Sequence, residues 1–175
     1  DRLISDIASS SRLEVELAKG EFEEIDIRDV LESVVEVTKT NISKKLEINV
    51  RLNTPKDEIK VLGIGDRIAQ VFYNLVDNAL SFSKPGSSIE INAWTTKNEA
   101  IIEVKDQGPG IPKENLGRIF ERFYTYRPEE KSFGNNSGLG LSICKQIIKS
   151  LNGTIIATNR AEGGATFTIM LPLKY

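Results

Sequence analysis

Two asparagines, Asn74 and Asn78, stand four residues apart in the apolar stretch of residues 70–83. At about 100° per residue, these two residues and Ser81 fall on one side of a helix. The apolar arc beside them contains Ile68, Val71, Phe72, Leu75, Val76 and Ala79. A carboxamide offers its oxygen to a hard cation such as Mg²⁺ and its NH2 group to a phosphate, without the repulsion that a carboxylate brings to a polyphosphate. The pattern therefore indicates a magnesium–nucleotide site, although two surface asparagines on an ordinary amphipathic helix would give the same spacing.

A carboxylate and two glycines form the motif Asp106-x-Gly108-x-Gly110 at the end of a predicted strand. The carboxylate can accept a hydrogen bond from an exocyclic amine, and the glycines let the backbone turn and let a flat ring approach closely. Because Asp and Gly also populate ordinary turns, this motif alone does not decide between a base-binding loop and a plain turn.

A second glycine pair, Gly138-x-Gly140, opens a predicted helix. Free backbone N–H groups at a helix N-terminus favour a bound phosphate, and the missing side chains admit it. No Gly-Lys-Ser/Thr follows, so the pair is not a P-loop, and its spacing is not that of a dinucleotide-binding fingerprint. Packing at a helix start would account for the two glycines as well.

Helices and strands must bring these three motifs together. Apolar periodicity and turn residues predict helices over residues 1–19, 27–44 and 138–151, and an asparagine helix between residues 63–66 and 85–86. They predict strands over residues 21–27, 46–52, 58–62, 88–96, 100–105, 154–158 and 165–171, a short amphipathic piece at 115–124, and a polar loop or lid at 125–137. Such a mixture is typical of one two-layer α+β domain.

Two of these helices carry further expectations. Asp26 is expected to cap the helix that begins near residue 27, with an inward face of Val30, Leu31, Val34, Val35 and Val37. The helix over residues 1–19 is either an amphipathic helix folded onto its own domain or the last turns of a helix whose partner is missing.

The composition of the chain limits which classes of function are expected. The chain has 175 residues, 39% of them hydrophobic, which suits one domain or one domain with a short appendage. Its net charge is −2 and no basic block occurs, so nucleic acid is not an expected partner. Cys144 is the single cysteine, which excludes an internal disulfide, and its apolar helix register predicts burial; the absence of histidine excludes an imidazole metal site. No apolar run of membrane-spanning length is present, and the start at Asp1 suggests a piece of a longer protein.

The order of the motifs is more specific than any one of them. They are the asparagine helix, Asp106-x-Gly108-x-Gly110, Ile119-Phe120-Glu-Arg122-Phe123-Tyr124, Gly138-Leu-Gly-Leu141 and Gly163-Gly-Ala-Thr-Phe167. In this order they resemble the ATP-binding domain of sensor histidine kinases, whose fold is shared with gyrase, the large heat-shock chaperones and the mismatch-repair ATPases. The resemblance covers residues 21–172, and residues 124–128 and 133–142 further resemble the ChvG-type branch.

The resemblance implies a Bergerat ATP-binding fold, a two-layer sandwich with a mixed sheet of about five strands packed on three helices. Residues 1–19 would be the C-terminal end of a dimerisation and histidine-phosphotransfer helix, and residues 20–175 the catalytic domain with its lid at about 125–137. Because the chain contains no histidine, it has no phosphoacceptor of its own, and that histidine would lie upstream of Asp1 in the parent protein.

The resemblance also assigns roles, with ATP and Mg²⁺ as ligand and cofactor. Asn78 would hold Mg²⁺, with Asn74 as a second candidate, and Arg122 would counter charge on the transferred phosphoryl group, although a solvated charge beside Glu121 is the alternative. The ATP-binding residues would be Asn74, Asn78, Phe82, Asp106, Gly108, Gly110, Ile111, Phe123, Tyr124, Gly138, Leu139, Gly140, Leu141 and Thr166. Among them, Asp106 would receive the adenine amine, residues 138–141 would supply phosphate-binding amides, and Thr166 would reach the adenine end, while Phe120 would help Phe123 to anchor the lid.

Departures from the family pattern bear on activity. Ser81 stands where many sensor kinases have lysine, and Thr125 where they have arginine, so Arg122, Arg127 or Lys131 would have to compensate. ATP-hydrolysing relatives have glutamate where this chain has Asn74, and a carboxamide cannot act as a general base, which favours transfer to a protein histidine over hydrolysis.

The expected partners are the parent homodimer's own hairpin and a response regulator, and the expected location is the cytoplasmic part of a bacterial inner-membrane sensor. Two alternatives remain open at this point. One is a degenerate nucleotide-binding docking module without kinase activity, and the other is a free-standing ATPase.

Overall fold

The computed structural model describes residues 2–42, 47–125 and 138–174. The helices are α1 (Arg2–Lys19), α2 (Ile27–Asn41), α3 (Gly65–Phe82) and α4 (Gly140–Ser150), with a 3₁₀ turn, η1, at Lys113–Asn115. The strands are β1 (Glu23–Asp26), β2 (Asn49–Asn53), β3 (Lys60–Gly63), β4 (Ser88–Thr95), β5 (Glu99–Lys105), β6 (Thr154–Asn159) and β7 (Ala165–Pro172). The expected lid lies outside the described residues except for Thr125, and so do Arg127 and Lys131. Among the described helices, none combines the length and apolarity needed to cross a membrane.

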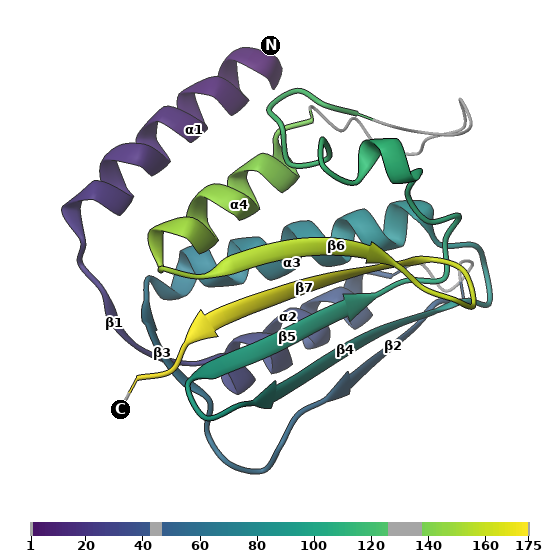
Figure 1. Ribbon diagram of the computed structural model, residues 1–175, viewed down its shortest axis with the longest axis horizontal. Coiled ribbons are helices and arrows are strands. Elements are labelled where there is room, and N and C mark those ends of the chain that lie inside the picture. The colour runs from purple at the N-terminus through teal and green to yellow at the C-terminus, as the bar shows by residue number, and fades with distance from the viewer. Residues whose placement is uncertain (1, 43–46, 126–137, 175) are drawn as a thin grey trace.

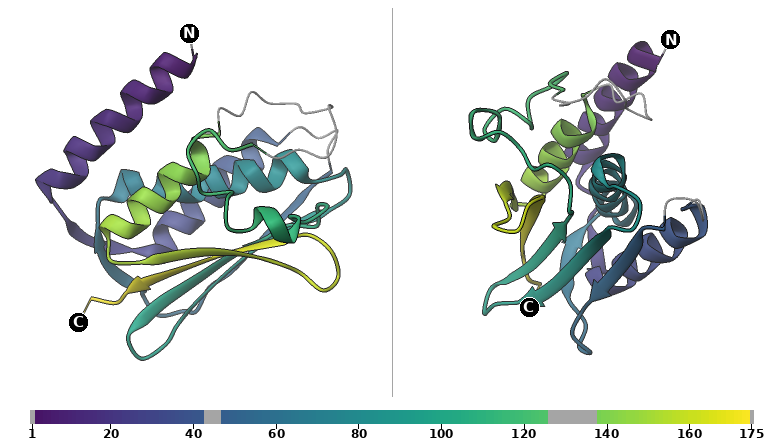
Figure 2. Two further views of the ribbon diagram at one scale, coloured as in Figure 1. Left: turned by 45° about the horizontal axis from the view of Figure 1, so that its top comes forward. Right: turned by 90° about the vertical axis from the view of Figure 1, so that its right-hand side faces the viewer.

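A five-stranded sheet forms one layer of the molecule. Its strand order is β2-β4-β5-β7-β6, with β2 parallel to β4 and the other neighbours antiparallel. Helices α2, α3 and α4 cover one face of this sheet, as both Figure 1 and Figure 2 show. The predicted two-layer α+β fold with a mixed five-stranded sheet on three helices is therefore confirmed.

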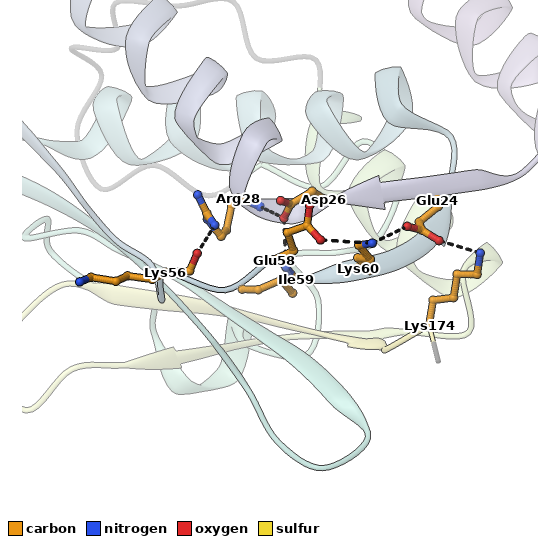
Figure 3. A network of polar contacts seen from close by, with 8 residues as sticks. All are labelled: Glu24, Asp26, Arg28, Lys56, Glu58, Ile59, Lys60 and Lys174. Carbon is orange, nitrogen blue, oxygen red and sulfur yellow. Dashed lines mark hydrogen bonds and ion pairs between the residues drawn. The ribbon is translucent and has the colours of Figure 1, made fainter.

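The first and third strands do not join this sheet. β1 and β3 pair antiparallel as a separate two-stranded sheet, so the seven predicted strands divide between two sheets. Figure 3 shows how the small sheet is fastened. Glu24 of β1 lies 3.0 Å from the Lys60 ammonium of β3 and accepts a 2.7 Å hydrogen bond from Lys174, just beyond β7. These two cations lower the pKa of Glu24, Lys174 more than Lys60, and they tie the small sheet to the end of the main one.

Helix α3 is oriented by its apolar arc. All six predicted residues of that arc, Ile68, Val71, Phe72, Leu75, Val76 and Ala79, are buried. Each large side chain among them contributes about 1.5–3 kcal/mol by leaving water. This burial fixes the rotation of α3 about its axis, and with it the direction of the polar seam that contains Asn74 and Asn78.

Helix α2 begins at the predicted residue, Ile27. The Asp26 carboxylate accepts from the N–H groups of Arg28 and Ile59, each at 3.0 Å, so the expected cap is confirmed and also joins β3. The inward face differs from the prediction at one position. Val37 is 43% exposed, because Thr38, one turn after Val34, occupies the buried position and donates its hydroxyl to the Val34 carbonyl.

Helix α1 packs on the domain from Ser10, which is buried, toward its C-terminal end. Leu13 is buried and Leu17 is partly buried, and the Arg67 guanidinium at the start of α3 donates to Glu16. Ile4 and Ile7 are at least half exposed, and the N-terminal end of α1 projects beyond the other helices (Figure 2, left). The second half thus matches the amphipathic helix folded on its own domain, while the first half presents apolar residues to solvent.

Candidate nucleotide-binding site

Asp106 lies at the end of β5 and is only 3% exposed. Its Oδ1 atom accepts from the N–H groups of Gly108, at 2.9 Å, and Ala165, at 3.1 Å. Both bonds fall on one oxygen, which leaves Oδ2 to accept from an exocyclic amine. Burial raises the pKa of this carboxyl, while the two N–H groups and the Arg160 charge oppose that rise. The geometry offers an acceptor to an amine-bearing ring at the end of the central strand, β5.

The glycines after Asp106 are required by close contacts. A Cβ atom on Gly108 would lie 3.0 Å from the Phe82 carbonyl oxygen and 3.1 Å from Asp106 Oδ1. Gly110 has φ +77°, a region that favours glycine. The structure thus brings together Phe82 at the end of α3, Asp106, and the loop that continues to the partly buried Ile111.

Thr166 is next to the residue that contacts Asp106. Ala165 and Phe167 belong to the core between sheet and helices, so the side chain of Thr166 points to the opposite face of β7. The contact with Asp106 comes from the backbone N–H of Ala165 instead. Thr166 is itself only 7% exposed, and its expected contact at the adenine end stays a prediction.

The N-terminus of α4 has the features of a phosphate site. Leu139 stands at the cap position and provides no side-chain hydrogen bond, and the first helical N–H groups have no partner within the helix. Gly140 is exposed, whereas Leu139 is buried and Leu141 is partly buried. Such uncapped amides with the positive end of the helix dipole bind anions.

Of the two asparagines, Asn74 contacts this helix start directly. Asn74 donates from Nδ2 to the Gly140 carbonyl at 3.3 Å, so it already joins α3 to α4 through its NH2 group. Asn78 is one turn further along α3 and partly exposed, and within the described part of the chain its side chain has no hydrogen-bond partner. Both carboxamide oxygens therefore stay available to a cation.

These oxygens fit Mg²⁺ that is bound together with phosphates. The described residues contain no group of three His, Cys, Asp or Glu side chains that could hold a metal. Mg²⁺ usually takes one or two protein oxygens and completes its shell with water and phosphate oxygens. Neutral carboxamides next to an anion-binding helix start provide that donor set.

The aromatic motif at residues 119–124 contacts the segment just before α4. The Phe120 ring meets Phe167 edge to face, with centroids 6.2 Å apart. Phe123 is 49% exposed, adopts φ +63°, and donates its N–H to the Gly138 carbonyl at 3.0 Å. A Cβ atom on Gly138 would lie 2.6 Å from the Phe123 carbonyl carbon, which explains the glycine there. Tyr124 is partly buried, with the Arg118 guanidinium 4.8 Å from its ring centroid.

Arg122, expected at the transferred phosphoryl group, contacts α1 in this structure. Its Nη2 atom donates to Glu14 Oε1 at 2.8 Å, and the two side chains are 56% and 54% exposed. The structure therefore brings Asn74 to the start of α4, with Asn78 one turn further along α3, and it engages Arg122 in an ion pair with another element.

Two polar side chains that sequence reasoning did not single out contact the loop after Asp106. Asn159 binds the backbone of Ile111, and Arg160 binds the carbonyl of Asp106. Their position just before the glycine pair 163–164 is the one signal in the sequence that could have drawn attention to them.

Comparison with known proteins agrees with this geometry. Residues 63–175 match the family described as histidine kinase-, DNA gyrase B-, and HSP90-like ATPase. The sensor protein ChvG of Rhizobium meliloti (strain 1021) is 40% identical over 98% of this chain, and the chain spans 32% of that relative's length. The resemblance to sensor histidine kinases of the ChvG type, expected from the motif order, is thereby confirmed.

Solved structures show the same fold. The catalytic domain of histidine kinase ThkA, in a nucleotide-free form, superposes with a TM-score of 0.75 at 30% identity, covering 87% of this chain and 95% of that domain. Histidine kinase ThkA in complex with the response regulator protein TrrA gives a TM-score of 0.73 at 28% identity, covering 96% of this chain and 49% of that one.

Proposed function

This chain belongs to the family of histidine kinase-, DNA gyrase B- and HSP90-like ATPases, and from that membership we propose that it is the ATP-binding catalytic domain of a bacterial sensor histidine kinase. It would bind Mg·ATP and pass the γ-phosphoryl group to a histidine elsewhere in the parent protein. The chain spans only about a third of the length of the curated ChvG relatives that it matches. Because it contains no histidine, the proposed phosphoacceptor would lie outside it.

One observation supports this function most strongly. Helix α3 contacts the start of α4 through Asn74 and the loop after Asp106 through Phe82. These two points are about two helical turns, or roughly 12 Å, apart along α3. An extended nucleoside triphosphate can span that separation, with its base at Asp106 and its phosphates at the uncapped helix.

Each group in the site has a distinct part in binding. Asp106 Oδ2 accepts from the adenine amine, while Phe82 and Ile111 flank the ring. The N–H groups of residues 140–142 hold the phosphates, and Asn78 supplies an oxygen for Mg²⁺. When bound, Mg²⁺ neutralises charge on the β- and γ-phosphates and orients them.

The proposed reaction is transfer rather than hydrolysis. A water molecule attacks a phosphate efficiently when a carboxylate orients and deprotonates it, and the carboxamide of Asn74 cannot accept that proton. Asn74 instead donates to the Gly140 carbonyl and holds the phosphate-binding helix against α3. A protein histidine is itself a nucleophile and does not need this base.

The partners follow from the same proposal. Helix α1 would be the end of the dimerisation and phosphotransfer hairpin, and its exposed Ile4 and Ile7 would then be covered by that hairpin. A response regulator would accept the phosphoryl group, as the complex of ThkA with TrrA suggests. The parent would be an inner-membrane sensor with this domain in the cytoplasm.

Calorimetric titration of Asn78→Ala tests the nucleotide site. Alanine favours the helix, so the variant should fold. Loss of a metal ligand or charged hydrogen bond should weaken Mg·ATP binding by about tenfold to a hundredfold. Asn41→Ala, at the exposed end of α2, is the control and should bind like the wild type. Unchanged affinity in Asn78→Ala would contradict the assignment.

Phosphotransfer needs a separate assay, because the site could bind nucleotide without being a kinase. The chain is mixed with labelled ATP and a helical hairpin from the parent protein that contains the histidine. Acid-labile labelling of the hairpin would support the proposed histidine kinase activity. ATP binding without labelling would favour the docking module, and rapid phosphate release without the hairpin would favour a free-standing ATPase.

A further inference from the structure

Asn159, the last residue of β6, binds the backbone of the loop that follows Asp106. Asn159 Oδ1 accepts from the Ile111 N–H at 2.8 Å, and Asn159 Nδ2 donates to the Ile111 carbonyl at 2.6 Å. One carboxamide thus satisfies both backbone groups of a single residue, as a neighbouring strand would do. This pair of bonds fixes the far end of the loop.

Arg160 fixes the near end of the same loop. Its Nη1 atom donates to the Asp106 carbonyl at 2.9 Å, and the side chain is 20% exposed. The turn that presents Arg160 is closed by two backbone bonds, Arg160 N–H to the Gly164 carbonyl at 2.9 Å and Gly163 N–H to the Arg160 carbonyl at 3.2 Å. The guanidinium also helps to keep the pKa of Asp106 from rising further.

Between these two ends the loop has little internal restraint. Its residues 107–110 include two glycines, which have the largest backbone entropy of any residue. Inside the loop, the Gly108 N–H donates to Asp106 Oδ1, and from outside it the Ser88 N–H of β4 donates to the exposed Gln107 side chain at 2.8 Å. Without Asn159 and Arg160, the segment that must meet the base would sample many conformations, and binding would have to order it at a cost in affinity.

We propose that Asn159 and Arg160 are positioning residues for base recognition: they hold the Asp106–Ile111 loop in its binding geometry without themselves touching the nucleotide. The inference rests on the proposed function, because it takes the base to bind at Asp106. It assigns two side chains on β6 and its following turn to the adenine end of the site, in addition to the residues of the sequence motifs.

The effect should depend on which part of the nucleotide is tested. Each lost restraint should weaken Mg·ATP binding by roughly threefold to tenfold. Inorganic tripolyphosphate with Mg²⁺ carries no base, so its affinity should not change. A general loss of stability does not produce this difference between the two ligands, and a positioning role does.

The experiment compares wild type with Asn159→Ala, Arg160→Gln and Arg160→Lys by calorimetric titration with both ligands. Lysine can still donate to the Asp106 carbonyl, so Arg160→Lys should recover most of the ATP affinity. Asn53→Ala is the matched control: Asn53 is also exposed and bonded through its side chain, to Asn92 at 2.7 Å, on the other edge of the sheet. It should change neither affinity.

The outcomes separate the two proposals. If the wild type binds no Mg·ATP, the proposed function fails. If it binds, and both Asn159→Ala and Arg160→Gln keep wild-type ATP affinity, or lose tripolyphosphate affinity in parallel, the positioning role is refuted. Hydrogen exchange of the free protein gives a readout that does not need a ligand: the Ile111 amide should lose protection in Asn159→Ala, while the α3 amides keep theirs. Unchanged protection at Ile111 would also refute the role.

Discussion

The ion pair between Glu14 and Arg122 should compete with nucleotide binding. If Arg122 acts on the phosphates, it must first leave the Glu14 carboxylate, which it contacts at 2.8 Å. Both side chains are more than half exposed, so the pair is worth about 0.2–1 kcal/mol. Glu14→Gln removes most of this competition and should raise Mg·ATP affinity by about 1.4-fold to fivefold.

The assay is calorimetric titration at low and at high salt. The gain should shrink at high salt, because salt screens exposed charges. Glu16→Gln is the matched control: it weakens the neighbouring contact of α1 with Arg67 and should leave the affinity unchanged. In an Arg122→Gln background, Glu14→Gln should have no effect. Unchanged affinity of Glu14→Gln at low salt, or an equal gain without Arg122, would refute the reasoning.

Three further predictions concern the buried groups and turns of the site. Gly164→Ala should lower the free energy of unfolding, measured in urea, by at least about 1 kcal/mol more than Gly163→Ala does. Both residues have φ near +95°, so both substitutions strain the backbone. Only at Gly164 would a Cβ atom also meet the Asp106 carbonyl oxygen, at 2.1 Å. Burial raises the pKa of Cys144 to about 12, so its thiol should resist a thiol-reactive dye at neutral pH and react once urea unfolds the chain; rapid labelling of the native chain would count against this burial. Burial also raises the pKa of Asp106 above its ordinary value of 3.8. Mg·ATP affinity should therefore begin to fall, on acidification from neutral pH, before a free aspartate would titrate, and a flat pH profile would contradict it.

Local patterns predicted the elements and the buried face of α3. The six residues of its arc share one period, and Asp26 stands where a cap is required, so both could be identified from neighbours in the sequence. Cys144 is buried as its helix register indicated. Burial of an apolar stripe depends mainly on spacing along one helix, and the sequence records that spacing directly.

Contacts between distant residues could not be predicted in the same way. Asn159 is 48 positions from Ile111, and Arg122 is 108 positions from Glu14. The local sequence does not reveal the partners of these polar residues, because each contact depends on how the sheet and helices are assembled. The separation of β1 and β3 into their own sheet has the same origin.

The position of Asn74 links the fold to the kind of reaction proposed. Its Nδ2 atom donates to the Gly140 carbonyl and so helps to set the start of α4 against α3. A glutamate at this position would have no N–H to donate, and its carboxylate would face the same carbonyl oxygen with like partial charge. The start of α4 would then have to shift before a base at position 74 could orient water beside the phosphates. In this chain the carboxamide therefore both removes the general base and supports the helix N-terminus that we propose binds phosphate, so we expect that a single substitution to glutamate would not by itself produce an efficient ATPase.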